Sequence, residues 1–196
     1  MKFILIFLGI ALFMGVAFFY STVYSQLAAA KINSAIKKAP IFRKLDKQKE
    51  ILYGTEIYDS IPRKKSSGVI FYADKKPETK EELEIANFNN CRAFSRKGKI
   101  LIKLGWNSGF SGSGFNIHYL LGRFEIEPYS FTDVVPAPAN LSRYKMIKQE
   151  VTLNQFYYHV GDSIYGKINM EMEERINRRT YKVFASGYFR TKVEKW

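Results

Sequence analysis

The chain is poor in the side chains that most often form catalytic and metal sites. It contains a single cysteine, Cys91, so an intrachain disulfide, a redox CxxC pair and a cysteine-rich zinc site are excluded. It contains two histidines, His118 and His159, which do not have the spacing of a metal-ligand pair. Cys91 also lies far from the apolar N-terminus, so it is not placed for lipidation at a membrane anchor.

The glycine-rich stretch from Gly105 to Gly114 lacks the features of two nucleotide-binding motifs and of a serine nucleophile turn. A phosphate-binding loop needs a Lys-Ser or Lys-Thr pair and then a helix, whereas Phe115-Asn116-Ile117 follows here in strand rhythm. A dinucleotide fingerprint fails for the same reason. A G-x-S-x-G turn fails because the stretch beginning at Gly109 lacks the closing glycine. We expect a hairpin loop with Phe110 as a candidate contact residue.

The titratable residues form no recognisable catalytic pattern. His118 lies on the strand face opposite Ile117 and Tyr119, and His159 lies beside a predicted Gly-Asp turn. Glu125 and Glu127 share one strand face, where the abundant lysines and arginines are their expected partners. We therefore identify no catalytic, cofactor-binding or metal-binding residue and no cofactor. A non-enzymatic role is favoured, and a Cys–His or Ser–His pair assembled by the fold stays open as a hydrolase alternative.

A long apolar run is present at the N-terminus. Residues Phe3 to Tyr20 contain no charge, and Phe3 to Tyr24 reaches the length of about 20 residues that a membrane-spanning helix needs. A cleaved signal peptide has an apolar core of about 7–15 residues, which is shorter than this run. Although Ala28 to Ala30 offers a cleavage site, the length favours a retained transmembrane anchor over residues 1–24.

The orientation of this anchor is open. The segment after it carries more basic residues than the segment before it, and the positive-inside rule alone places the following domain in the cytoplasm. The layout of a signal-like segment followed by one folded domain is typical of exported proteins. We predict a single-pass membrane protein with its domain outside the cytoplasm. The basic residues after the anchor are Lys31, Lys37, Lys38, Arg43, Lys44, Lys47 and Lys49.

Residues 25–40 have the pattern of a juxtamembrane amphipathic helix. Ala28, Ile32 and Ile36 recur at helical spacing, with lysines on the other face. Pro40 is expected to end this helix. The helix is suited either to lie on lipid headgroups or to pack on the domain, and the sequence does not decide between them.

Residues 41–196 are predicted to form a single β-rich domain. Apolar residues alternate with polar ones in several runs, and a phase change between two of them places a turn at Gly122. Thr79-Lys80-Glu81-Glu82 fits a capping box and predicts one short helix. The fold class is therefore mainly β, β-sandwich-like and antiparallel, with one short helix, after an N-terminal transmembrane helix. The expected strands lie at 51–53, 69–72, 100–106, 115–121, 124–126, 164–172 and 183–193, with a bulge at Gly187 and a proline-rich connector near 134–140.

Two local patterns resemble known groups of proteins. The Gly-Asp turn and strand from Tyr158 to Ile168 resemble those of immunoglobulin-like and arrestin-like sandwiches. The segments Phe124–Asp133, Gly161–Ser163 and Gly187–Val193 together are similar to an uncharacterised group of bacterial membrane or envelope proteins. This second resemblance covers about the last 75 residues. It implies no activity, ligand or site.

Composition favours binding over catalysis. The net charge of +13 is spread along the chain, and 16 phenylalanines and 13 tyrosines offer large contact surfaces. We expect a structural or accessory protein of the cell envelope. Its partners are the lipid bilayer, through Phe3 to Tyr24, and a candidate envelope protein. A basic module that binds nucleic acid or another anionic polymer is the alternative, although no nucleic-acid motif supports it. The oligomeric state is open.

Overall fold

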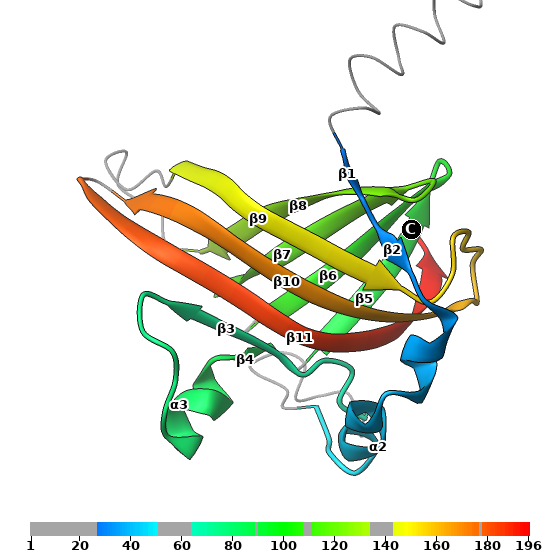
Figure 1. Cartoon of the computed structure of the whole chain (residues 1–196), viewed down its shortest axis with the longest axis horizontal. Helices are drawn as coiled ribbons and strands as arrows, with labels where there is room; N and C mark the ends of the chain where they lie inside the picture. Colours follow the sequence, from blue (N-terminus) through cyan, green and yellow to red (C-terminus); the bar gives the residue numbers. More distant parts are fainter. Residues whose placement is uncertain (1–26, 51–63, 89, 108–110, 134–142, 177) are drawn as a thin grey trace, which may run out of the picture.

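The prediction of a mainly β chain is confirmed. The computed structural model describes residues 27–50, 64–88, 90–107, 111–133, 143–176 and 178–196 (Figure 1). The predicted anchor, the predicted strand at 51–53 and the predicted connector near 134–140 lie outside these residues. The strands are β1 (Ala28–Ala29), β2 (Lys31–Ile32), β3 (Val69–Ala73), β4 (Asn87–Phe88), β5 (Asn90–Arg96), β6 (Lys99–Asn107), β7 (Ser111–Leu120), β8 (Arg123–Thr132), β9 (Arg143–Leu153), β10 (Ser163–Ile176) and β11 (Arg179–Lys195).

The long strands form two layers that share β11. In one layer β5, β6, β7 and β8 pair antiparallel in chain order. In the other layer the spatial order is β9, β10, β11 and then β3, and neighbouring strands are again antiparallel. The 17-residue β11 pairs with β3 over Val183–Ser186 and runs parallel to β5 over Val193–Lys195. Figure 1 shows this strand curving past both layers. One edge of the structure is therefore closed by a continuous strand.

The opposite edge is bridged by the segment that was predicted to be a helix. Residues 28–32 are extended instead: Ala28 pairs with Phe124 of β8, and Ile32 pairs with Leu153 of β9. The Asn33 amide then donates to the Leu153 carbonyl at 2.8 Å. Alanine and isoleucine tolerate both helix and strand, and here the two sheet edges supply hydrogen-bond partners for the extended form.

Within the described residues, helical structure begins after this bridge. A 3₁₀ helix, η2, covers Ser34–Lys38, and Pro40 is the first residue of α2 (Pro40–Asp46). Pro40 therefore starts a helix instead of ending one, because its missing N–H is not needed in the first turn. Phe42 is buried and its ring contacts Tyr165 edge-on, with ring centroids 5.0 Å apart. The segment thus packs on the domain, which was one of the two alternatives.

Among the described residues, no helix combines the length and apolar character needed to cross a bilayer.

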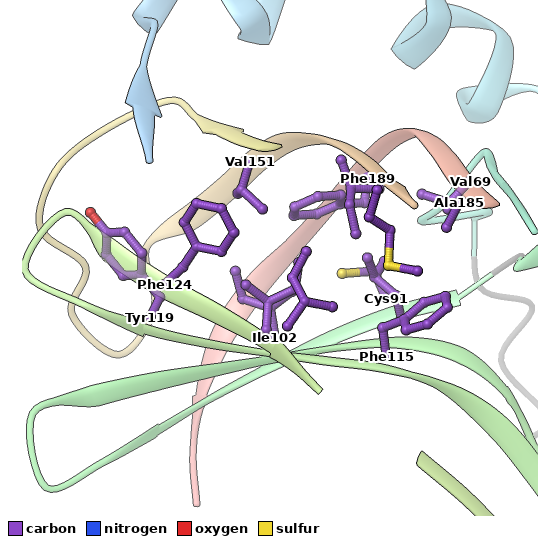
Figure 2. Packing of buried hydrophobic residues seen from close by; sticks show 14 of the residues in the cluster. Val69, Cys91, Ile102, Phe115, Tyr119, Phe124, Val151, Ala185 and Phe189 are labelled. Atoms are coloured by element: carbon purple, nitrogen blue, oxygen red, sulfur yellow. The ribbon is translucent and has the colours of Figure 1, made fainter. Parts of the chain in front are cut away.

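The core lies between the two layers (Figure 2). Leu121 and Gly122 have φ values of 48° and 79°, which form the tight turn predicted between β7 and β8. The turn brings Phe115 and Tyr119 of β7 and Phe124 of β8 to the same buried face. The other layer contributes, among others, Val151, Ile164, Ile168, Met170, Val183 and Phe189.

Two further local predictions have different outcomes. The capping box is confirmed: the Glu82 amide donates to Thr79 Oγ1 and the Thr79 amide donates to Glu82 Oε2, both at 3.1 Å, at the start of α3 (Lys80–Ile85). The bulge at Gly187 is wrong, since the β10–β11 register is continuous there. Gly187 has a φ of 149°, and a Cβ on it would lie 2.3 Å from the Gly68 carbonyl oxygen. This glycine therefore permits close backbone approach.

Candidate functional site

A seam lies between β8 and β9 beyond the N-terminal bridge. Within the part of the chain that the structure describes, β1 pairs with β8 only at Arg123 and Phe124, and β2 pairs with β9 only at Thr152 and Leu153. Past these residues the two facing edges share no ladder. A side chain links them instead, because the Ile126 amide donates to Gln149 Oε1 at 3.3 Å. Among the described residues, the seam is therefore closed by side chains and not by backbone pairing.

At two successive seam-facing positions, the β8 edge offers no free backbone donor. The Ile126 amide faces the seam, and it already donates its hydrogen bond to the Gln149 side chain. Backbone groups of a strand alternate in direction, so Pro128 faces the same way and has no N–H to give. Proline on an edge strand discourages the addition of another strand. The seam is therefore better suited to side-chain recognition than to strand pairing.

The larger hollow at the seam has a volume of about 360 Å³, which is in the range of small-ligand sites. We call it the seam pocket. It brings together Leu27 from the start of the described chain, β7 and β8 side chains, and Tyr144 from β9. Its complete lining is Leu27, Lys99, His118, Tyr119, Leu120, Glu125, Ile126, Glu127 and Tyr144.

The polar side chains of the seam pocket include one direct pair. His118 Nε2 lies 3.1 Å from Glu127 Oε2, and both side chains are about half exposed. His118 was flagged from the sequence, but Glu127 was expected to meet a lysine or arginine instead. The lining residues include no serine, threonine or cysteine. A His–carboxylate pair without such a nucleophile is suited to binding a polar ligand, and it does not form a nucleophilic triad.

Tyr144 adds a hydroxyl group to this rim. Its partial removal from water raises its pKa, and the negative charges of Glu127 and Glu125 raise it further. The hydroxyl therefore stays protonated at neutral pH and is available as a hydrogen-bond donor. The same two carboxylates favour a cation in the pocket.

A smaller hollow of about 90 Å³ lies beside the seam pocket and shares Tyr144 with it. It is lined by apolar side chains such as Phe115 and Met172 and by backbone at Gly114. Gly114 packs so closely against the neighbouring strand that an added Cβ would lie 2.0 Å from the Leu104 carbonyl oxygen. Much of the glycine-rich stretch is thus paired strand in the β6–β7 hairpin, and Phe110 lies outside the described residues.

The other residues flagged from the sequence do not join the seam pocket. His159 is exposed, and its Nδ1 lies 3.6 Å from Asp162 Oδ2 in its own loop. Cys91 is fully buried, and burial raises the pKa of its thiol well above the usual range. Within the described ranges, no group of three or more His, Cys, Asp and Glu side chains is arranged to hold a metal ion.

A buried ion pair was missed by the sequence analysis. Glu50 has a side chain only 1% exposed, and it accepts two hydrogen bonds from the Arg92 guanidinium, at 3.0 and 2.8 Å. The Ser66 hydroxyl also donates to Glu50 and accepts from the Cys91 amide at 2.7 Å. The two partners of Glu50, Ser66 and Arg92, are 16 and 42 residues away from it in sequence, so no local spacing predicts this ion pair. The network is satisfied and structural.

Comparison with protein-family models, with curated proteins and with solved structures finds no match for this chain.

Proposed function

We propose that this chain is a single-pass membrane protein in which a transmembrane helix over Phe3–Tyr24 carries a β-sandwich-like binding domain outside the cytoplasm. Its role is structural or accessory, in the cell envelope. One observation carries the proposal. Leu27, three residues after the end of the apolar segment, lines the seam pocket, and its carbonyl accepts a hydrogen bond from Arg123 at 2.9 Å. An anchor that ends at Tyr24 would therefore join the domain beside the seam pocket.

The partner we propose is a protein segment that presents a positively charged side chain. Glu125, Glu127 and Tyr144 supply two carboxylates and an aromatic hydroxyl at the rim. Lys99 and His118 also line the pocket, so only a cation that approaches from the side of the carboxylates is favoured. A phosphate backbone would meet the carboxylates unfavourably. This pocket therefore supports protein binding over the nucleic-acid alternative.

Membrane anchoring and orientation can be tested together in intact cells. The full chain should stay in the pellet after alkaline carbonate extraction. Cys91 is buried, so a thiol reagent reports topology only through an exposed substitution such as Lys76→Cys. We expect an impermeant maleimide to label Lys76→Cys in whole cells. Release of the unprocessed chain by carbonate would contradict the anchor, and labelling only after lysis would contradict the orientation.

The seam pocket can be tested by photo-crosslinking in the native membrane. A photoreactive amino acid at Tyr144 should give a discrete adduct, whereas the same group at exposed Lys76, outside the seam pocket, should not. The double change Glu125→Gln and Glu127→Gln should abolish the adduct. A matched control, Glu78→Gln with Glu81→Gln, changes the net charge equally on the exposed region around α3. An adduct that survives the first pair would count against the pocket.

A further inference from the structure

Exposed apolar side chains gather at one end of the β domain. We call this the apolar end and define it as residues 96–99, 121–123, 154–163 and 192–196. Tyr157 and Val160 of the β9–β10 loop are 61% and 56% exposed, and Trp196 is 58% exposed. Leu121 and Phe156 are exposed by 45% and 41%. An apolar cluster of this kind on a folded surface indicates contact with another surface.

Hydrogen bonds and packing hold these four segments together. The Gly161 amide donates to the Val193 carbonyl at 2.7 Å, which fixes the β9–β10 loop to the end of β11. The Tyr119 hydroxyl donates to the Phe156 carbonyl at 2.7 Å, next to the β7–β8 turn. In Figure 1 this turn, the β9–β10 loop and the C-terminus lie at the same end of the molecule.

The β9–β10 loop presents its apolar side chains from a well-bonded frame. Buried Asn154 accepts from the Tyr165 amide at 2.7 Å and from the Tyr158 hydroxyl at 2.8 Å, and its own amide group donates to the Ser163 carbonyl. The His159 amide donates to Asp162 Oδ2 at 2.8 Å. This frame turns Tyr158 inward and leaves its neighbour Tyr157 outward. The exposure of Tyr157 is thus built into the loop.

Charge at the apolar end is strongly positive. Six basic residues stand against two acidic ones, Asp162 and Glu194. The Arg96 guanidinium lies over the Trp196 ring, 5.5 Å from its centroid, so a cation and an exposed indole are presented together. Aromatic side chains combined with lysine and arginine are typical of the bilayer interface. The six basic residues are Arg96, Lys97, Lys99, Arg123, Lys192 and Lys195.

We infer that the apolar end is a second membrane contact, which docks the β domain on anionic lipid headgroups with Tyr157, Val160 and Trp196 in the interface. This inference rests on the anchor proposed above. Ala28 pairs with Phe124 and Ala29 with Arg123, so the described chain begins beside β8 about 10 Å from the β7–β8 turn, at ~3.4 Å per residue, and runs towards that turn. An anchor joined at Leu27 would tether the apolar end close to the same membrane surface.

The test uses the full chain reconstituted in vesicles that contain anionic lipid and a headgroup-linked nitroxide. A fluorophore is attached at His159→Cys in the loop or, as a control, at Arg178→Cys in the turn after β10. Buried Cys91 stays unlabelled. We expect quenching of the His159→Cys label and little quenching at Arg178→Cys. Tyr157→Ser with Val160→Ser should remove the quenching, whereas Ile147→Ser, at another exposed apolar site on β9, should not.

The possible results distinguish a failure of the docking from a failure of the anchor. Chains that float with the vesicles but show equal, weak quenching at both labels would overturn the docking while leaving the anchor intact. Chains that do not float would overturn the anchor and the docking with it. Quenching that is unchanged in neutral vesicles would overturn the role of anionic headgroups. Thermal melts of the Tyr157→Ser, Val160→Ser variant should match the parent, because both side chains are exposed.

Discussion

The two edges at which the layers meet are closed in different ways. On one side the 17-residue β11 belongs to both layers, pairing with β10 from Ser163 to Ile176 and with β5 near its end. On the other side two strands of two residues each bridge β8 and β9. Because β11 is one continuous strand with a long ladder, it joins the two layers firmly at this edge, which we call the β11 joint. The short ladders of β1 and β2 leave most of the opposite edge unpaired within the described ranges. The seam pocket lies on the side that is less strongly joined.

The side-chain interactions at the two edges differ in the same way as the backbone pairing. At the β11 joint, Arg190 lies 2.9 Å from Asp46 of α2, and Arg92 of β5 holds Glu50. At the seam, the side-chain links between described residues are single hydrogen bonds, from Arg123 to the Leu27 carbonyl and from the Ile126 amide to Gln149. Loss of a contact at the joint should therefore unfold the domain, while loss at the seam should open it locally.

The largest expected effect is at the β11 joint. Phe189 is fully buried, and its ring fills the space that Gly166 leaves on β10. Phe189→Ala should lower the free energy of unfolding by about 3–5 kcal/mol because it leaves a cavity between the layers. Urea denaturation followed by circular dichroism measures this loss. Phe189→Leu is the control and should recover most of the stability; equal losses for both would argue against a cavity effect.

A somewhat smaller effect is expected from the buried ion pair. Arg92→Met leaves the Glu50 carboxylate buried without its main partner, which should cost about 3 kcal/mol. Adding Glu50→Gln removes the buried charge, so the double variant should be more stable than Arg92→Met alone. Thermal unfolding of the four members of this cycle gives the coupling. A double variant as unstable as the sum of the single ones would contradict the pairing.

At the seam, Arg123→Ala should have a local effect. It removes the hydrogen bond to the Leu27 carbonyl, worth about 1 kcal/mol. Hydrogen exchange should accelerate in residues 28–33 and change little in β10 and β11. Arg123→Lys keeps the charge but not the geometry of the guanidinium, so it is the control for charge. Uniform acceleration over all strands would mean that the two edges are equally essential.

The smallest effect should lie away from both edges. Thr79→Ala removes the cap of α3 and should cost about 1 kcal/mol, with faster exchange confined to residues 80–86. The Glu78 and Thr79 amides lower the pKa of the Glu82 carboxyl by donating to it. Its capping contribution is therefore present at neutral pH and is lost as the pH falls through this lowered pKa. Exchange in α3 that is independent of pH would contradict this reciprocal cap.

Sequence patterns predicted the strands whose side chains alternate between core and solvent. Ile100, Ile102 and Leu104 are buried at every second position, as expected, and Gly122 makes the turn that the phase change required. By contrast, β9 was not predicted, because its first eight residues include no buried side chain and so carry no alternation. Its place is set by the β10 ladder, which is a tertiary effect.

The site was less predictable than the fold. Leu27, His118 and Tyr144 are distant in sequence and meet only because the bridge and the two layers bring β8 and β9 together. His118 and the two glutamates were noticed individually, but no spacing rule connects them with Tyr144. The extended bridge itself was mistaken for a helix, because the 3.6-residue spacing of its small apolar residues satisfied a helical pattern equally well.

Pro128 has one further consequence. Chains held at a membrane meet their own copies in two dimensions, at far higher local density than in free solution. An unprotected strand edge under such crowding would invite copies to polymerise edge to edge. If the chain is anchored as proposed above, the missing N–H of Pro128 in the middle of β8 should disfavour such pairing between copies.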